Sequence, residues 1–369
     1  MSFDLIDKKM MLRCIQLAKK GLGNTYPNPL VGSVITHNNK IIGEGWHQKA
    51  GLPHAEINAI ESVENKELLS QSTLYVNLEP CSHFGKTPPC ADAIIKYNIP
   101  KVVIGHIDLS SKVNGKGIEK LQNHGIEVKS NCLPLETYEI NKRFFTFHQK
   151  KRPFIILKWA ETSDGFMGKK DEQIWISNPK AKQVVHQLRT QEQAILVGKN
   201  TVLTDNPKLN ARAFYGKNPI RIVLDRKLDI PSYFFVLDNS VKTLIINEKI
   251  EKTESNNYYI KLNLEDKNWT KKIIDELYKY EIQSVIIEGG SYTLTQFIEN
   301  NLWDEANIFV AWDRKMETGI KSPELKNHQL VYSKSMDNNL LNHYINQNRE
   351  QLHGLNPLDI ERVCPFLNS

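Results

Sequence analysis

Short apolar runs alternate with amphipathic stretches along the first 130 residues of the chain. This alternation is typical of a domain in which helices pack on a sheet. Four short runs rich in strand-favouring residues are expected to form strands: 30–35, 40–46, 73–78 and 101–105. Two stretches between them are expected to form helices, 55–63 and 91–97. Pro88 and Pro89 precede the second one, at a place where proline favours a helix start.

A second alternating series follows a polar, basic passage, His148–Arg152, that leads to Pro153. Its expected strands are 154–159, 194–197, 220–224, 241–246, 285–288 and 306–310, and its expected helices lie near 180–190 and 271–280. The two series share no repeat, so neither is a duplicate of the other. We therefore expect an α/β protein with domains at 1–148 and 149–345 and a tail, 346–369, for which no role is predicted.

Length and composition agree with two globular domains. A chain of 369 residues is longer than one hydrophobic core usually serves, and 40% of its residues are hydrophobic. No run approaches the roughly 20 apolar residues of a membrane helix, and the charged start, Met1–Lys9, lacks an apolar signal core. We therefore expect a cytoplasmic protein that does not bind membranes.

Charge and cysteine content narrow the choice of partners. The net charge of +6 indicates an anionic partner, and scattered basic residues among 42 acidic ones favour a phosphorylated metabolite over nucleic acid. Five widely spaced cysteines without a secretion signal argue against a disulfide framework and leave thiols for metal binding. Cys14, Cys132 and Cys364 have no metal-binding neighbours in the sequence and are expected to be structural or free.

Four residues of the first domain combine the groups of a catalytic zinc site: His54, Glu56, Cys81 and Cys90. One imidazole and two thiolates give three protein ligands, which leaves the fourth position of the metal for water. Glu56 is placed to move protons around that water without being a ligand. Each ligand alone is more simply explained as a buried histidine or a reduced thiol, but the combination, with Pro80 before Cys81, favours zinc.

The same residues form the His-x-Glu and Pro-Cys signature of zinc-dependent base deaminases. The usual second half of that signature is Cys-x-x-Cys, whereas eight residues separate Cys81 from Cys90. This spacing still allows Cys81 to follow a strand and Cys90 to open a helix, whose N-terminus favours a thiolate.

Longer segments resemble the bifunctional deaminase–reductases of riboflavin biosynthesis. In the first domain they are Pro27–Gly32, Glu79–Cys90 and Asn114–Ile118. In the second they are Lys158, Ser163–Gly165, Trp175–Ser177, Thr201–Pro207 and Glu288–Gly290. The resemblance spans residues 8–310 and implies a cytidine-deaminase-like three-layer domain followed by a dihydrofolate-reductase-like domain. It also implies zinc and NADPH as cofactors and a homo-oligomer.

By this resemblance, the first domain removes the 2-amino group of 2,5-diamino-6-(5-phosphoribosylamino)pyrimidin-4(3H)-one as ammonia. Asn28, His83, Lys86 and Asp108 stand where the family holds the pyrimidine and its phosphoribosyl arm. After Asp108 the chain reads Leu-Ser-Ser, where the family usually has a turn with two prolines. The affinity of the first domain for its substrate is therefore expected to differ from that of the family.

The second domain has an apolar strand, Ser284–Glu288, that leads into Gly289 and Gly290 and an apolar helix to Ile298. Backbone N–H groups in such a turn can approach a phosphate at the positive end of the helix. Without the full Gly-x-Gly-x-x-Gly spacing, two glycines after a strand more often form only a tight turn. The resemblance implies that NADPH binds here and reduces the ribosyl arm of 5-amino-6-(5-phosphoribosylamino)uracil to ribityl.

Further residues of the second site are assigned by position. The implied cofactor contacts are Glu161, Trp175, Thr201, Asp205, Gly290, Ser291, Tyr292, Thr293, Leu294, Thr295 and Gln296. The implied substrate contacts are Gln173, Arg189, Leu209, Arg212 and Glu288. Arginines suit a phosphate because a guanidinium can donate to two oxygens at once. Each arginine is equally well explained as a surface residue. Trp175 has the alternative of being a core aromatic. Lys158 and Asp205 are candidates for handling the proton that accompanies hydride transfer.

Arg226 is a separate candidate, assigned from its place after the strand 220–224. A guanidinium there can meet the 2′-phosphate that distinguishes NADPH from NADH. The alternative is a solvent-facing arginine in a turn.

Two other functions compete with this interpretation. The first is a zinc deaminase of nucleosides or RNA with a non-catalytic C-terminal domain. An enzyme that acts on RNA would need a basic surface with exposed aromatic residues, and the sequence has no run of basic and aromatic residues. The second is a nucleic-acid-binding protein with a structural zinc, which would need a fourth ligand, and Glu56 is poorly spaced for that role. We therefore expect a small-molecule substrate and no nucleic acid partner.

Overall fold

The computed structural model describes residues 2–84, 88–110, 114–170 and 172–348. Within them the chain forms two compact units, and the change from one to the other falls between Lys151 and Arg152. Part of the expected basic linker is helical, because α6 (Lys142–Lys150) continues to Lys150 and ends at Lys151, where the backbone is left-handed with φ 54°. The domain limits inferred from the sequence remain a prediction.

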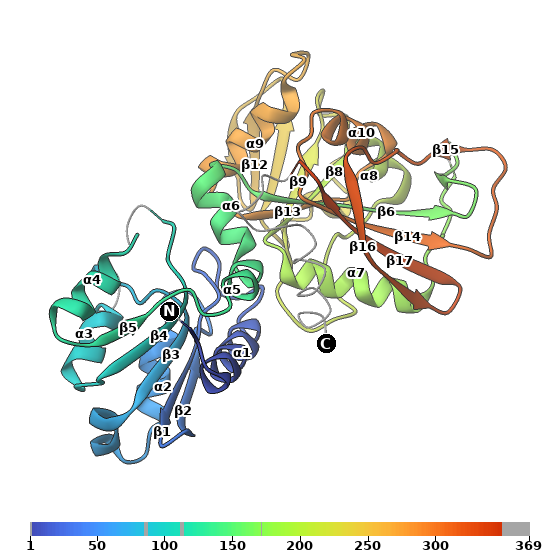
Figure 1. Cartoon of the computed structure of the whole chain (residues 1–369). Helices are drawn as coiled ribbons and strands as arrows, with labels where there is room; N and C mark the ends of the chain where they lie inside the picture. The colour runs from blue at the N-terminus through green and yellow to red at the C-terminus, as the bar shows by residue number, and fades with distance from the viewer. Residues whose placement is uncertain (1, 85–87, 111–113, 171, 349–369) are drawn as a thin grey trace. The chain divides into compact units, whose positions relative to one another are not determined.

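The first unit contains a five-stranded sheet with helices on both faces (Figure 1). Its elements are α1 (Leu5–Lys19), β1 (Gly32–His37), β2 (Lys40–Trp46), α2 (Ala55–Ser62), η1 (Lys66–Gln71), β3 (Thr73–Leu78), α3 (Cys90–Lys96), β4 (Lys101–His106), α4 (Lys116–Asn123), β5 (Glu127–Lys129), α5 (Pro134–Ile140) and α6. The strand order is β2-β1-β3-β4-β5; β1 is antiparallel to β2 and β3, while β3, β4 and β5 are parallel. The loops after β3 and β4 therefore leave the same edge of the sheet.

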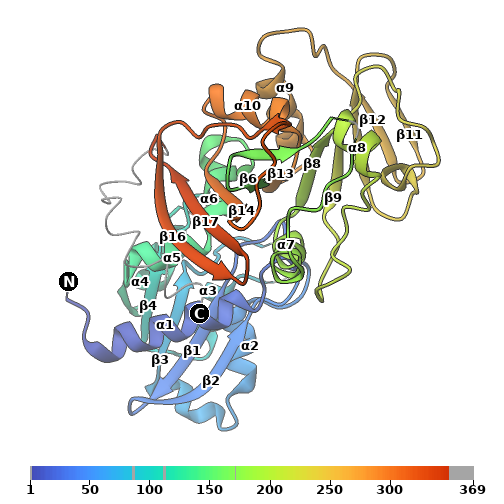
Figure 2. The same ribbon diagram turned by 90° about the vertical axis from the view of Figure 1, so that its right-hand side faces the viewer.

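Both faces of this sheet are covered. Ile35, Leu74 and Val76 pack with α2, α3 and α4 on one face. Val34 and Tyr75 pack with α1 on the other face, where α5 lies next to β4. Figure 2 shows α1 crossing the strands. Burial on both faces explains why the three inner strands β1, β3 and β4 are mostly apolar rather than alternating, whereas the edge strands β2 and β5 are partly exposed.

The second unit is built on a ten-stranded sheet that is parallel in its centre and antiparallel at both edges (Figure 1). Its elements are β6 (Phe154–Thr162), β7 (Phe166–Gly168), α7 (Pro179–Gln191), β8 (Ala194–Gly198), α8 (Lys199–Asp205), β9 (Ile220–Leu224), η2 (Phe235–Leu237), β10 (Thr243–Asn247), β11 (Lys252–Glu254), β12 (Asn257–Lys261), α9 (Trp269–Lys279), β13 (Ser284–Ile287), α10 (Ser291–Glu299), β14 (Glu305–Ala311), β15 (Ile320–Lys321), β16 (His328–Met336) and β17 (Asn339–Asn346). The order is β11-β12-β10-β9-β8-β13-β6-β14-β17-β16, and β15 pairs with β7 outside it.

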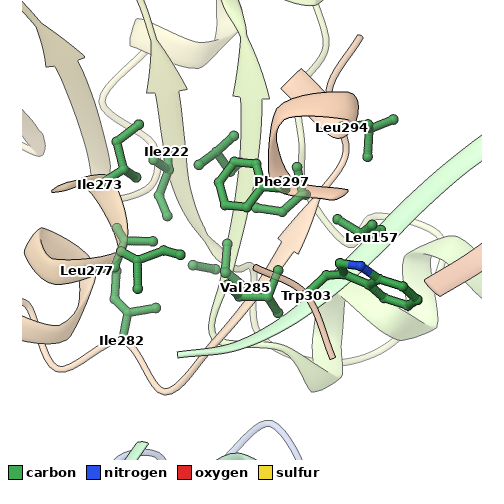
Figure 3. Close-up of a cluster of buried hydrophobic side chains, with 14 of the residues drawn as sticks. Leu157, Ile222, Ile273, Leu277, Ile282, Val285, Leu294, Phe297 and Trp303 are labelled. Carbon is green, nitrogen blue, oxygen red and sulfur yellow. The ribbon is translucent and has the colours of Figure 1, made fainter. Parts of the chain in front are cut away.

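The main hydrophobic cluster of this unit lies between the sheet and helices α9 and α10 (Figure 3). It joins side chains of α9, of α10 and of the strands, among them Ile273, Leu277, Phe297, Ile222 and Val285. Helix α7 covers the opposite face through its own buried residues. The parallel strands of this sheet are thus also buried on both faces.

Every strand and helix expected from the sequence is present, with ends shifted by a few residues, and the predicted α/β class is confirmed. The pattern did not predict the hairpin of β16 and β17. Strand β16 is largely exposed, so its sequence lacks the apolar run that marks the central strands. Among the described residues, no helix is both long and apolar enough to cross a membrane.

We predict that Leu277→Ala lowers the free energy of unfolding of the second unit by about 2–5 kcal/mol, because Leu277 is 1% exposed and its loss leaves a cavity in the main cluster. Tryptophan fluorescence in denaturant is the measurement, since five of the six tryptophans follow residue 152. Asp275→Ala, an exposed position on the same helix, is the control and should change the transition little. Equal effects of both variants would contradict the assigned core.

Two candidate active sites

The three expected zinc ligands come from three places in the first unit and lie together. His54 is the N-cap residue of α2, Cys81 lies in the loop after β3, and Cys90 is the first residue of α3. The His54 Nδ1 lies 3.6 Å from the Cys81 Sγ and 3.2 Å from the Cys90 Sγ. Donor atoms around a tetrahedral zinc with bonds of about 2.0–2.3 Å lie about 3.6 Å apart, so this donor set fits zinc.

The two thiols differ in pKa because one donates a hydrogen bond to the other. The hydrogen bond from Cys90 lowers the pKa of Cys81 to about 4, against the effect of burial, and the same bond raises the pKa of Cys90. The backbone N–H of Cys90 also donates to the Cys81 sulfur, over 3.3 Å. Cys81 is therefore held as a thiolate, the form that binds a metal.

Glu56 lies beside these donors in the first turn of α2 and is 3% exposed. Burial raises the pKa of its carboxyl group to about 7, although the charge of His54 opposes that shift. The carboxyl group also has a hydrogen bond with Cys90. A buried group with a pKa near neutrality thus stands next to the three ligands, and its role in moving protons stays a prediction.

A second histidine, His47, connects the ligands to Asn28, and the sequence did not reveal it. Its ring lies edge-on to the ring of His54, with centroids 5.3 Å apart. Its Nδ1 lies 3.1 Å from the Pro53 carbonyl oxygen, and its Nε2 lies 3.1 Å from the Asn28 amide nitrogen. Burial lowers the pKa of His47, which favours a neutral ring that donates to the carbonyl and accepts from the amide. The only sequence signal was a histidine directly after an expected strand.

A buried carboxylate, Glu79, ties together the loops around this site. It accepts four backbone N–H groups, from Asp108 at 3.2 Å, Gly115 at 3.0 Å, Gly117 at 2.8 Å and Ile118 at 3.3 Å. Gly117 passes so close that a Cβ would lie 2.1 Å from the Pro80 carbonyl oxygen. Since Pro80 precedes Cys81, these contacts also fix the turn that carries a zinc ligand.

The expected substrate residues Asp108 and His83 are electrostatic neighbours. Burial raises the pKa of Asp108, and the charge of His83 opposes that rise. The Asp108 Oδ1 accepts the N–H of Ser110 at 2.8 Å and so closes the turn in which the chain departs from the family pattern. Lys86 lies outside the described residues.

The second site is centred on Glu288, which directly follows β13. Its carboxylate binds the Lys158 Nζ at 2.8 Å and the Arg189 Nη2 at 2.9 Å. Burial opposes its ionisation, but the charges of Arg189 and Lys158 outweigh burial and hold the pKa of Glu288 at about 2. Lys158 comes from β6 and Arg189 from α7, so three elements meet at this carboxylate.

Other expected substrate residues adjoin Arg189. Its Nη1 donates to the Asn210 carbonyl at 3.1 Å, and Arg212 donates to the Asn210 side-chain oxygen at 2.9 Å. The side chain of Leu209 packs in the core and is 3% exposed, so only its backbone can reach a ligand. The two guanidinium groups therefore meet at one loop residue.

Two more titratable groups stand near Glu288. Burial raises the pKa of the Asp205 carboxyl group, which accepts a hydrogen bond from Gln173, although much of the residue is exposed. His186, which the sequence did not reveal, lies three residues before Arg189; burial and the charges of Arg189 and Arg212 lower its pKa. Its only signal was a histidine on the buried face of a helix.

The glycine turn leads into α10 as expected, and Gly290 is the N-cap residue. A Cβ on Gly290 would lie 3.7 Å from the Thr201 Oγ1, so this turn and the start of α8 are adjacent. Along the helix, Tyr292 is exposed, Ser291, Thr295 and Gln296 are partly exposed, and Thr293 and Leu294 are buried. The side chain of Leu294 belongs to the hydrophobic cluster (Figure 3), so only its backbone can contact a cofactor.

Glu161 and Trp175 occupy different environments. Glu161 accepts the indole N–H of Trp159 at 2.8 Å. Trp175 is 58% exposed and the Lys182 Nζ lies 3.8 Å from its ring centre, which excludes the alternative of a core aromatic. A cofactor role for either residue stays a prediction.

Arg226 follows β9, as the sequence indicated. Its guanidinium binds the Glu248 carboxylate at 2.6 Å and also pairs with Glu265. These ion pairs hold the guanidinium at the end of the strand. A role in cofactor binding stays a prediction.

Comparison with known proteins matches both units. Residues 5–106 match the cytidine and deoxycytidylate deaminase zinc-binding region, and residues 153–311 match the RibD C-terminal domain. The riboflavin biosynthesis protein RibD of Aquifex aeolicus is 42% identical over 313 residues, 83% of this chain and 87% of its own length. RibD of Escherichia coli is 33% identical over 322 residues, 83% of this chain and 87% of its own length.

Solved structures agree. The diaminohydroxyphosphoribosylaminopyrimidine deaminase/5-amino-6-(5-phosphoribosylamino)uracil reductase of Thermotoga maritima aligns with a TM-score of 0.85 at 36% identity, covering 92% of this chain and 99% of that one. Acinetobacter baumannii RibD aligns with a TM-score of 0.84 at 30% identity, covering 92% and 98%. The first unit therefore has a cytidine-deaminase-like fold and the second the fold of the reductase domain, as predicted. The chain belongs to the RibD family of bifunctional deaminase–reductases of riboflavin biosynthesis.

Proposed function

We propose that the first unit deaminates 2,5-diamino-6-(5-phosphoribosylamino)pyrimidin-4(3H)-one and that the second reduces the ribosyl arm of the resulting uracil. The observation that carries this proposal is the meeting of His54, Cys81 and Cys90 within 4.8 Å, with the buried Glu56 beside them. A deaminase with a non-catalytic C-terminal domain is disfavoured, because the second unit matches the reductase domain of the family.

Zinc held by His54, Cys81 and Cys90 supplies a Lewis acid that lowers the pKa of water towards about 7. The Glu56 carboxylate takes a proton from the attacking water and delivers it to the amine that leaves C2 of the pyrimidine. Asn28, held by His47, offers amide contacts to the ring. Asp108, His83 and Lys86 are assigned to the remaining polar groups of the substrate.

NADPH, the cofactor of the second domain, supplies the hydride. Glu288 holds Lys158 through one oxygen, and an ammonium group has three protons to donate. We therefore assign delivery of a proton to the ribosyl oxygen to Lys158, and assign Asp205, which interacts with Glu288, to the same proton. Arg189 and Arg212, on either side of Asn210, are assigned to the phosphate. Gln173, Leu209 and Glu288 complete the substrate contacts.

We assign NADPH to the turn between β13 and α10. The N-terminus of α10 offers backbone N–H groups to a phosphate, and its N-cap residue, Gly290, has no side chain to occupy them. Thr201 and Asp205 of the neighbouring helix, Glu161, Trp175 and the stretch Gly290–Gln296 complete the assignment. Arg226 is assigned to the 2′-phosphate.

The chain acts on a small molecule, as its family does. We further propose that it works in the cytoplasm as a homo-oligomer, independently of membranes and nucleic acids. The scattered charge supports the last part, because a nucleic acid partner would require a continuous basic surface. Sedimentation of the purified chain tests the oligomer.

Metal analysis tests the zinc site. We expect about one zinc per chain in the purified protein, and a large loss of zinc when Cys81→Ser and Cys90→Ser are combined, because a hydroxyl is a poorer zinc ligand than a thiolate. Cys14→Ala, which removes a thiol that is outside the zinc cluster, is the control and should keep its zinc. Zinc retained by the double variant would place the metal elsewhere.

Glu56→Gln tests both activities at once. The variant keeps the size of the side chain and removes the group that moves protons, so ammonia release should fall by about 10²–10⁴-fold. Oxidation of NADPH with substrate that is already deaminated should stay nearly unchanged, since Glu56 belongs to the first unit. Glu61→Gln, exposed on the same helix, is the control. A matched loss of both rates in a folded, zinc-loaded variant would refute separate sites.

Arg226→Ala tests the choice of cofactor. Removal of the guanidinium should raise the KM for NADPH much more than the KM for NADH, because the two differ only in the 2′-phosphate. Glu248→Gln breaks an ion pair of Arg226 without removing the guanidinium, so it should preserve the preference for NADPH. If Arg226→Ala weakens both cofactors equally, the residue serves only the ion pairs.

A further inference from the structure

The chain between the two matched regions, residues 107–152, includes helices α5 and α6. Most of it falls in the first domain expected from the sequence, beyond the part that matches the deaminase family. In the structure its junction residue, Asn141, reaches back to the loop between α1 and β1, 111 positions earlier. This contact links the segment to the loop that carries Asn28 of the deaminase site.

Asn141 holds both backbone groups of Leu30. Its Oδ1 accepts the Leu30 N–H at 2.8 Å, and its Nδ2 donates to the Leu30 carbonyl at 2.9 Å. The Asn77 Nδ2 donates to the same carbonyl at 2.9 Å, and the Asn77 Oδ1 accepts the N–H of Gly32 at 2.7 Å. Asn141 is 2% exposed and Asn77 is 0% exposed, so water cannot replace these bonds. Two buried amides thus clamp one loop.

The position of Asn141 in its own helix argues against a local role. Asn141 is the N-cap residue of α6, a place where an asparagine side chain usually accepts an N–H of the first turn. Here the side chain makes no such bond. Its donor and its acceptor both serve Leu30, so the residue acts on the distant loop and not on its helix.

The clamped loop carries Asn28 into the first site. Asn28 lies two residues before Leu30, and its amide meets the ring of His47 at 3.1 Å. His47 in turn binds the carbonyl of Pro53, the residue before the zinc ligand His54. A shift of Leu30 would therefore move Asn28 relative to the ligands without touching the ligands themselves.

We propose that Asn141, supported by Asn77, is a positioning residue of the deaminase: it fixes the Leu30 loop so that Asn28 faces the pyrimidine beside the zinc. The segment α5–α6 is then part of the first active site rather than a connection between domains. This proposal rests on the proposed deaminase function and on Asn28 as a substrate contact.

The test compares Asn141→Ala with Asn141→Asp in the full-length, zinc-loaded chain. Alanine removes both bonds. Aspartate is an equally good N-cap residue, so any capping role of position 141 is kept. It places an oxygen instead of an N–H group against the Leu30 carbonyl, so the bond to that carbonyl is lost. Both should raise the deaminase KM by about tenfold and change kcat less, because Asn28 binds substrate and transition state alike. Zinc content and NADPH oxidation with deaminated substrate should stay at the level of the unaltered chain.

Two controls separate positioning from general damage. Asn65→Ala removes an asparagine that does cap its helix, η1, and should leave the deaminase KM unchanged. Adding Asn141→Ala to Asn28→Ala should raise the KM little further, since both changes remove the same contact. An unchanged KM in both Asn141 variants, a fully additive double variant, or loss of zinc in both would overturn the proposal. If the unaltered chain releases no ammonia, the proposed function itself fails, whatever the variants do.

Discussion

A carboxylate at the end of a parallel strand, largely shielded from solvent, holds each candidate site together. In the first unit Glu79 follows β3 and gathers four backbone N–H groups from the loop after β4 and the start of α4. These N–H dipoles take the place of water around the buried side chain, so its oxygens have hydrogen-bond partners. The strand end, the loop that carries Asp108 and the turn that carries Cys81 are thereby fixed relative to one another.

Glu288 is also largely removed from water, but it is stabilised by two positive charges instead of backbone dipoles. Burial alone would favour the protonated acid, but Arg189 and Lys158 hold its pKa at about 2. An ion pair of this kind costs desolvation energy that only good geometry recovers, so it contributes little net stability. Its value lies in orientation: one carboxylate fixes a lysine of β6 and an arginine of α7 on the same side of the sheet. The loss of Glu288 would leave these two cations without the carboxylate that they share.

The sequence predicted those parts of the molecule that depend on local pattern. The central strands appear because burial on both faces demands continuous apolar runs. The zinc ligands appear because His54, Glu56, Cys81 and Cys90 form a recognisable motif of side-chain types. His47 and Asn141 escaped prediction, since their roles come from bonds to distant backbone groups. The Asn141 bonds, for example, span 111 positions. The sequence around a histidine or asparagine does not indicate such a distant partner. Residues that support a site are therefore harder to predict from the sequence than residues that form it.

Hydrogen bonds between residues far apart in the sequence also fix the boundary between the two units. Asn141 anchors the start of α6 to the first unit, and the left-handed Lys151 ends that helix. The next residue, Arg152, binds both carboxylate oxygens of Asp304, at 2.6 and 2.7 Å, while Asp304 also accepts the N–H of Ile155. Each side of the connection is thus fixed by long-range bonds within its own unit. The hydrogen bonds and ion pairs described above for each site join residues of one unit, in keeping with two activities in one chain.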